Sequence, residues 1–252
     1  RDYYASRGLG DVYKRQPGKI SDMFKALFKN DQAMTVVVSI ILVYTSLNIC
    51  GNLVLYFFRF DVGNEGAYSI FAAVAFAAQV LVMMVIPLLR KRFSKSQLFI
   101  SGFIIQIAGF AVILIMAFAK LYTPQSWYIL CLPGILIYLG YGMLNVIMTI
   151  FLSDSVDYGE VMNGTREESV IFSMQTFTVK LASGVAVFLA GLVVDWIHLD
   201  TAAAVQTQDT LDALRMWMTI PSVILLIVGI FVFKRFYKLD DTRMEEIKSK
   251  LN

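Results

Sequence analysis

The sequence predicts an all-α integral membrane protein with six transmembrane helices. Of its 252 residues, 58% are hydrophobic and only 16% are charged, and the mean hydropathy is +0.65. Soluble domains do not carry so large an apolar share, whereas membrane-spanning bundles do. The apolar residues gather in six segments, and Lys and Arg concentrate in alternate connectors between them. This distribution is typical of multi-pass membrane proteins.

The six predicted spans follow one another through most of the chain. A helix needs about 20 apolar residues to cross the roughly 30 Å hydrocarbon core of a bilayer. Segments of that length and character are residues 33–59, 67–89, 97–119, 127–152, 169–194 and 214–233. Because the connectors between them are mostly short and polar, we expect one six-helix bundle over residues 33–236.

The two ends of the chain differ from this bundle. Residues 1–16 contain no initiator Met and look like a translated adapter or assembly scar, so we exclude them from the fold. On that interpretation the chain is a fragment whose N-terminal part is missing. Residues 17–32 are amphipathic and basic, and we predict a cytoplasmic linker helix that leads into a second bundle; the alternative is a helix lying on the membrane surface. Residues 237–252 are predicted to form a short helical cytoplasmic tail.

The basic residues predict how the bundle is oriented. Most Lys and Arg residues fall in one set of connectors and near both chain ends, including RKRFSKS after the second span and KRFYK after the sixth. The opposite side carries mainly acids, such as Asp61, Asp200 and Asp212. By the positive-inside rule we expect both chain ends in the cytoplasm and the protein in the inner or plasma membrane of its cell.

The fifth predicted span carries a polar stripe. Its members recur at spacings of four, three, four and three, which places them on one helix face; they are Ser169, Ser173, Thr176, Lys180 and Ser183. Lys180 lies about 17 Å along the span, near the middle of the bilayer. An ammonium there costs about 2.5–3.5 kcal/mol or more unless water or a counter-charge meets it. We therefore expect a water-filled cavity and a carboxylate from outside this chain; the alternative is a structural ion pair between two helices.

Two further pairs of polar residues lie inside predicted spans. Asn48 and Asn52 in the first span, and Tyr141 and Asn145 in the fourth, are each four residues apart and share a helix face. Amides and phenols both donate and accept hydrogen bonds, which suits a ligand rich in hydroxyl groups. The same groups also join transmembrane helices to one another. Ligand binding and helix packing therefore stand as alternatives for both pairs.

The connector at residues 152–169, LSDSVDYGEVMNGTREES, is unusually charged for so apolar a chain. Three of its acids follow one another at intervals of three, so a continued helix would hold them close together on one side. Gly164 then permits a turn that brings a guanidinium back toward carboxylates, with which it forms charge-assisted bonds. We predict a cytoplasmic lock between two helix ends, with a solvated loop as the alternative. The residues of this lock are Asp154, Asp157, Glu160, Arg166 and Glu168.

Two neighbouring segments resemble a known family. DSVDYGEVMNGTREES followed by FSMQTFTVKLASG is similar to the signature of the glycoside–pentoside–hexuronide:cation symporters. That family includes the melibiose permeases and belongs to the major facilitator superfamily, and the resemblance covers residues 20–240. It implies twelve transmembrane helices in two six-helix halves, with this chain as the C-terminal half. It also implies transport of a sugar or glycoside, coupled to Na⁺, H⁺ or Li⁺, by alternating access.

The resemblance also implies roles for individual residues and partners. Gln175 and Lys180 correspond to a Gln and a Lys near the sugar, and Thr176 corresponds to a Thr near the cation. The acids that chiefly bind cation and sugar belong to the N-terminal half, which is therefore the implied protein partner beside the lipid bilayer. No cofactor is implied, no metal ion other than Na⁺ at Thr176, and no nucleic acid.

Sugar:cation symport is the leading hypothesis, with two alternatives. The sequence contains no Ser/His/Asp set, no Cys/His cluster and no phosphate-binding glycine loop, so we do not expect an enzyme. A lysolipid or amphiphile carrier on the same scaffold is one alternative, which a lateral apolar opening between helices would favour. A non-transporting six-helix scaffold or sensor is the other, and the buried position predicted for the Lys180 charge argues against it.

Overall fold

The computed structural model describes residues 25, 28–164 and 166–251, and its regular structure is helical throughout these residues. The predicted assembly scar at 1–16 lies outside the described residues, as does most of the predicted linker at 17–32. In chain order, the elements are α3 (Asp31–Tyr56), η1 (Phe57–Asp61), α4 (Ala67–Leu89), α5 (Lys95–Phe118), η2 (Trp127–Leu130), α6 (Cys131–Asn163), α7 (Glu168–Trp196), α8 (Gln208–Phe236) and α9 (Asp241–Leu251).

The six predicted spans are confirmed as helices long and apolar enough to cross a membrane. The largest difference concerns α6, which runs past the expected end at residue 152 as far as Asn163. The acids of the predicted connector therefore lie on the last turns of a helix. α6 ends where Gly164 adopts a left-handed backbone with φ of 71°, a conformation that glycine takes without the steric cost of a Cβ.

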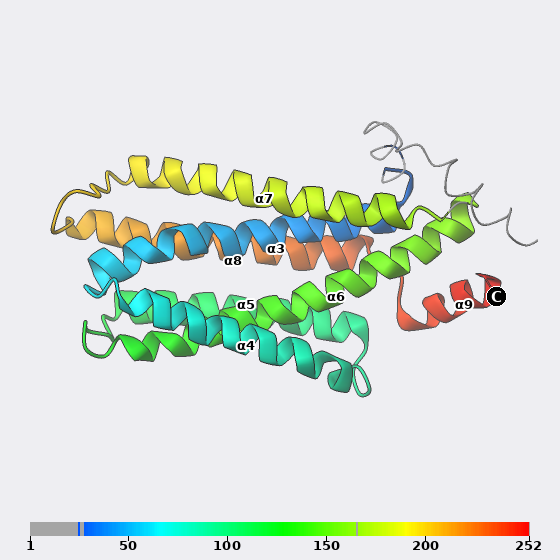
Figure 1. Ribbon diagram of the computed structural model, residues 1–252, viewed down its shortest axis with the longest axis horizontal. Helices are drawn as coiled ribbons and strands as arrows, with labels where there is room; N and C mark the ends of the chain where they lie inside the picture. The colour runs from blue at the N-terminus through cyan, green and yellow to red at the C-terminus, as the bar shows by residue number, and fades with distance from the viewer. Residues whose placement is uncertain (1–24, 26–27, 165, 252) are drawn as a thin grey trace, which may run out of the picture.

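The bundle consists of two groups of three helices (Figure 1). α3 packs against α7 and α8, while α6 packs against α4 and α5; contacts of α3 with α6 and of α5 with α8 join the groups. Each central helix thus packs against two helices from the other half of the sequence. This exchange is the arrangement expected of an internal repeat, in which α3, α4 and α5 correspond to α6, α7 and α8.

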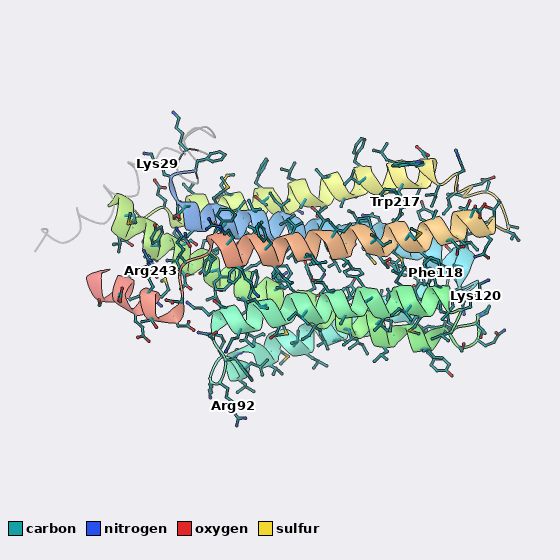
Figure 2. The ribbon with its side chains drawn as sticks, turned by 180° about the vertical axis from the view of Figure 1, so that it is seen from behind. Lys29, Arg92, Phe118, Lys120, Trp217 and Arg243 are labelled. Atoms are coloured by element: carbon teal, nitrogen blue, oxygen red, sulfur yellow. The ribbon has the colours of Figure 1, made fainter. Side chains whose placement is uncertain are left out.

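The ends of the bundle differ in charge. Figure 2 shows Lys29, Arg92 and Arg243 toward the end that carries α9, and Trp217 and Lys120 toward the opposite end. The concentration of basic residues expected at one side is therefore present in three dimensions.

One buried ion pair lies at the end opposite α9. Arg215 of α8 donates from Nε and Nη2 to the two carboxylate oxygens of Asp61, at 2.8 and 2.5 Å, and each side chain is only 3% exposed. The Tyr122 hydroxyl donates to the same carboxylate at 2.6 Å. The sequence analysis used Asp61 only as an orientation marker. In the structure it joins the end of α3, the start of α8 and the α5–α6 connector.

A second buried ion pair lies at the α9 end. Lys95, the first residue of α5, pairs with Asp154 of α6, and both side chains are 7% exposed. Asp241 of α9 lies 3.4 Å from the Lys95 ammonium and 3.3 Å from Arg90. Under the correspondence of α3 with α6 and of α8 with α5, the two buried pairs occupy equivalent places. Each joins a carboxylate in or just after the last part of a central helix to a base in the first part of an outer helix.

Asn30 ties the start of α3 to the end of α6. Its carbonyl oxygen accepts the Ala33 backbone N–H at 2.9 Å and so caps α3, while its amide donates to the Ser155 carbonyl oxygen at 2.7 Å. A Cβ on Gly159 would lie 2.7 Å from the Asn30 amide nitrogen, so only glycine leaves room for this approach. The charged end of α6 is therefore held firmly against α3.

Replacing Arg215 in the buried pair with Asp61 is expected to destabilise the protein much more than replacing the exposed Arg59. Arg215→Gln leaves a buried carboxylate without its counter-charge and is expected to cost about 3–5 kcal/mol. Arg59→Gln is the matched control: Arg59 pairs with Glu65 at 3.6 Å, the two side chains are 43% and 56% exposed, and such surface pairs contribute about 0–1 kcal/mol. Thermal unfolding of both purified variants measures the difference. Equal transition temperatures would show that the buried pair does not hold this end together.

Candidate functional site

The polar stripe predicted on α7 points away from the six-helix bundle. Ser169, Ser173, Thr176 and Lys180 are exposed, and Ser183 is half-buried. The helix packs instead through small residues, because Ala182, Ala186 and Ala190 are only 1%, 0% and 4% exposed. Small side chains at intervals of four allow a neighbouring helix to approach closely, and that neighbour is α3. The packing of α7 therefore leaves its polar face without a covering helix among the residues that the structure describes.

Lys180 takes part in none of the ion pairs formed among the described residues. Gln175 is half-buried beside it, and the Thr176 hydroxyl donates to the Phe172 carbonyl oxygen of its own helix at 3.2 Å. Within the described chain, no group of three or more His, Cys, Asp or Glu side chains is placed to hold a metal ion. An ammonium at this depth needs water or a counter-charge, because the hydrocarbon core of a bilayer does not solvate a charge.

A second polar cluster lies between α3 and α6. Asn145 of α6 donates to the Tyr44 hydroxyl of α3 at 2.9 Å, and the rings of Tyr44 and Tyr141 meet edge to face with centroids 5.5 Å apart. Asn48 donates to the Tyr44 carbonyl oxygen and Asn52 to the Asn48 carbonyl oxygen, each at 2.7 Å. One amide N–H of each α3 asparagine is thus used within its own helix, and the side-chain oxygens are left to accept hydrogen bonds.

The sequence analysis missed Tyr44, although a signal for it was present. Tyr44 lies four residues before Asn48, so it continues the face that Asn48 and Asn52 define. The structure brings Tyr141 and Asn145 to this residue, and so joins the two predicted pairs into one cluster. Among the described residues, no hydrogen bond connects this cluster to Gln175 or Lys180.

Arg166 gathers most of the predicted lock around its guanidinium. Its Nη1 lies 2.9 Å from both Asp157 and Glu160 on α6, and its Nε lies 3.2 Å from Glu168 at the start of α7. Hydrogen bonds to Glu160, Asp157 and Glu168 raise the pKa of Arg166 further above its ordinary value. The Arg166 side chain is 45% exposed, so water competes for every one of these contacts. The network links two helix ends and can be broken at low cost.

Asp154 was predicted to be part of this lock, but it forms no ion pair with Arg166 and pairs with Lys95 instead. Residues three apart on a helix differ by about 60° in direction, so three acids in succession turn around α6. Asp154 faces α5 and pairs with Lys95, whereas Asp157 and Glu160 reach Arg166. At Asp241, burial alone would raise the pKa, but the charges of Lys95 and Arg90 outweigh it and lower that pKa. Asp154 is therefore part of a buried structural network.

Comparison with known families agrees with this architecture. The family model described as MFS/sugar transport protein matches residues 4–241. The chain belongs to this family of the major facilitator superfamily. The membership confirms the resemblance to sugar:cation symporters found in the sequence.

Several relatives of this family member are transporters by name. An uncharacterized symporter, YjmB, of Bacillus subtilis is 25% identical over 233 residues, which cover 92% of this chain and 49% of the relative. The raffinose carrier protein of Pediococcus pentosaceus is 23% identical, with 92% and 35% covered. The isoprimeverose transporter of Lactiplantibacillus pentosus is 25% identical, with 91% and 46% covered. The chain therefore spans half or less of the length of these relatives, whose names are those of transporters and not of enzymes.

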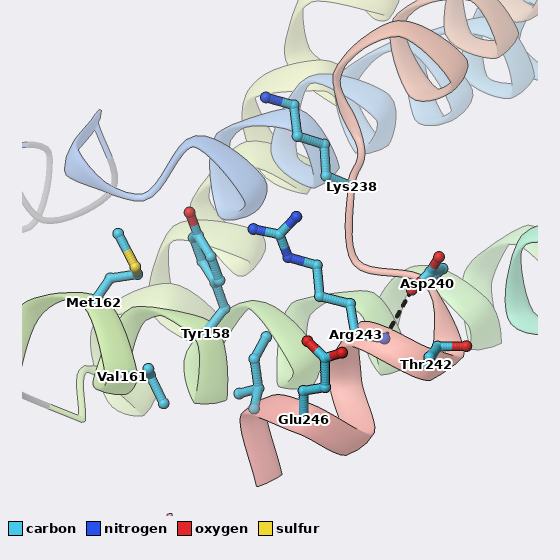
Figure 3. Close-up of a pocket in the computed structure, with 9 residues that line it drawn as sticks. Tyr158, Val161, Met162, Lys238, Asp240, Thr242, Arg243 and Glu246 are labelled. Carbon is cyan, nitrogen blue, oxygen red and sulfur yellow. Dashed lines mark hydrogen bonds between the residues drawn. The ribbon is translucent and has the colours of Figure 1, made fainter. Parts of the chain in front are cut away.

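A pocket of about 390 Å³ lies between the end of α6 and α9 in this family member (Figure 3). The apolar face of α9 packs through Met244 and Ile247 against Tyr158 and its neighbours on α6. Bases and acids both line the pocket; they are Lys238, Arg243, Asp240 and Glu246. Because it lies beyond the last span and has no excess of one charge, we do not assign the substrate to it.

Replacing two aspartates of α6 one at a time tests whether the buried network contributes more to stability than the exposed Arg166 network. Asp154→Asn leaves Lys95 buried beside only the more distant Asp241, and is expected to cost about 3 kcal/mol. Asp157→Asn, three residues away, removes an exposed contact of Arg166 and is expected to cost about 0–1 kcal/mol. The midpoints of denaturant unfolding for the two variants provide the comparison. A larger loss in Asp157→Asn would contradict the assignment.

Proposed function

We propose that the chain is the C-terminal half of a transporter that carries a sugar or glycoside together with Na⁺ or H⁺ across the cell membrane. Membership in the MFS/sugar transport family and the named raffinose, isoprimeverose and lactose relatives support this proposal. The observation that carries it is Lys180, an ammonium about 18 Å from the start of α7 on the face turned away from the bundle. A lipid-facing charge at that depth is costly, whereas a charge lining an aqueous pathway is not.

A second six-helix half supplies the other wall of this pathway. The polar face of α7 has no covering helix among the described residues, and α4 is also largely exposed. The relatives are long enough for another bundle of the same size, because the chain covers 35–49% of the three described above. A carboxylate from that half would meet Lys180 and remove the cost of its isolated charge.

Different polar groups would bind the sugar and the coupling ion. Gln175 and Lys180 offer hydrogen-bond donors to sugar hydroxyls, and the Thr176 oxygen contributes to the cation site, where Na⁺, H⁺ or Li⁺ is the coupling ion. On α3 and α6, the side-chain oxygens of Asn48 and Asn52 accept from hydroxyls, next to Tyr141 and Asn145. A sugar needs such an alternation of donors and acceptors, since each of its hydroxyls does both.

The Arg166 network acts as a cytoplasmic lock during alternating access. Its ion pairs are exposed and each contributes about 0–1 kcal/mol, so together they can bias two conformations that differ by a few kcal/mol. The two halves would rock around a midplane site, closing one end of the pathway as the other opens. In this arrangement both ends of the chain lie in the cytoplasm.

Replacing Lys180 tests the proposed pathway. In the complete transporter that contains this chain, Lys180→Ala is expected to reduce cation-driven sugar accumulation to background, because the side chain contacts substrate and not the bundle core. Lys120→Ala is the matched control, since Lys120 is exposed in the α5–α6 connector. Uptake by cells expressing equal amounts of each variant gives the comparison. Normal accumulation in Lys180→Ala would refute the proposed role.

A lysolipid or amphiphile carrier is the second candidate, and one observation favours it. An apolar groove of about 530 Å³ lies between α7 and α8, with α3 at its floor. Such a lateral opening is what an amphiphile pathway would require, and apart from Thr45 and the indole of Trp217 its lining is apolar.

Ligand-dependent stability separates the two candidates. A ligand at about 100 times its Kd stabilises the folded state by about 2.7 kcal/mol and so raises the unfolding temperature. We expect a sugar from a panel of mono- and oligosaccharides to raise it in the presence of Na⁺ or at low pH, and lysophosphatidylcholine below its micellar concentration to give no further increase in protein that keeps its own membrane lipids. The opposite pattern would favour the amphiphile carrier.

A further inference from the structure

The groove between α7 and α8 has a definite place within the spans. Thr45 and Ile49 of α3 form its floor, Leu189 of α7 one wall, and Trp217, Ile220 and Ile224 of α8 are among the residues of the other wall. At the end opposite α9, the rings of Trp196 and Trp217 lie 5.3 Å apart and connect the two walls. The groove therefore extends from this aromatic pair toward the middle of the bilayer.

The groove and the polar stripe lie on opposite sides of α7. Leu189 follows Lys180 by nine residues, which is about two and a half helical turns and hence half a rotation. The second six-helix half that is proposed to cover the polar stripe would therefore lie on the side of α7 opposite the groove and would leave the groove unfilled. The surface next to the groove is apolar and exposed, with Val185 at 43%, Phe188 at 65% and Ile224 at 54%. This surface faces hydrocarbon, so the occupant of the groove comes from the bilayer.

The chemistry of the lining selects one kind of occupant. Apart from Thr45, which is only 7% exposed, and the indole of Trp217, the lining side chains are apolar, so water would find too few hydrogen-bond partners there. An empty groove would lose the dispersion contacts that its walls can make. A flexible hydrocarbon chain supplies these contacts, and Trp side chains favour the headgroup level at which such a chain begins.

We propose that this groove binds one acyl chain of a membrane phospholipid from the leaflet in which Trp196 and Trp217 lie. The lipid belongs to the folded protein and is not its cargo. Its chain fills the space that α7 and α8 leave above α3, and its headgroup lies beside the two indoles. The inference rests on the membrane-spanning position of the bundle and is independent of which substrate is transported.

Two phenylalanine variants on one helix test the binding of the chain. Ile220→Phe fills the groove from the α8 wall, whereas Ile227→Phe adds the same volume to an exposed position of α8 outside the groove, 54% exposed. Native mass spectrometry of the complete transporter, purified in mild detergent, counts the phospholipids that remain bound. The Ile220→Phe variant is expected to retain one phospholipid fewer than Ile227→Phe and the unmodified protein. Equal counts in all three would overturn the proposal.

A second measurement does not depend on whether the filled variant folds. The protein is reconstituted with phosphatidylcholine brominated on the acyl chain, and the bound lipid is kept during transfer to detergent. The fluorescence of Trp217 is the part of the total tryptophan emission that is lost in the Trp217→Phe variant. We expect the brominated chain to quench this part of the emission, and the quenching to persist after free lipid has been diluted away. If the Trp217 emission recovered fully when the free lipid is diluted away, the lipid would be in rapid exchange with the bulk bilayer lipid, and the proposal would be overturned.

Discussion

The fold depends on two buried ion pairs, one at each end of the bundle. Asp61 with Arg215, and Asp154 with Lys95, place charges where the helices leave the apolar part of the structure. A charge in such a place is expensive without its partner, so each pair dictates which helix ends meet. Because the pairs occupy equivalent positions in the internal repeat, the two groups of helices are closed in the same way. Between the two ends, α3 packs along α8 and α6 packs along α5.

α7 is attached to the bundle differently from α8. No buried ion pair among the described residues involves it; it packs through Ala182, Ala186 and Ala190, and its first residue, Glu168, belongs to the exposed Arg166 network. In contrast, α8 is joined to α3 by a reciprocal pair of bonds, in which the hydroxyls of Ser46 and Ser222 each donate to the other residue's carbonyl oxygen. The polar stripe thus lies on a helix that has no buried polar bond to its neighbours among the described residues. Under the proposed function, such a helix would suit the surface along which the two halves of the transporter rearrange.

Much of the fold could be predicted because the bilayer imposes strict lengths and polarities on its helices. The six spans, and the exposed face of α7, follow from hydrophobic runs and from the spacing of five polar residues. The site was predicted less completely. Asp154 was assigned to the lock because three acids recur at even spacing, but a helix turns about 60° between such positions, and a base on α5 lies on the side to which Asp154 points. Tyr44 was missed because tyrosine is common in apolar spans, and only its hydrogen bond with Asn145 marks it as part of a polar cluster.

By itself, the sequence determined the membrane class of this protein, the number of its spans, the polar stripe with Lys180, and the segments that resemble sugar:cation symporters. These properties are local, since they depend on the composition and periodicity of one helix at a time. Only the tertiary structure decided which charges pair, that the α3 and α6 polar residues form one cluster, and that α7 and α8 leave an apolar groove above α3. These features arise between segments far apart in the chain, where the direction of each side chain depends on the neighbours against which its helix packs.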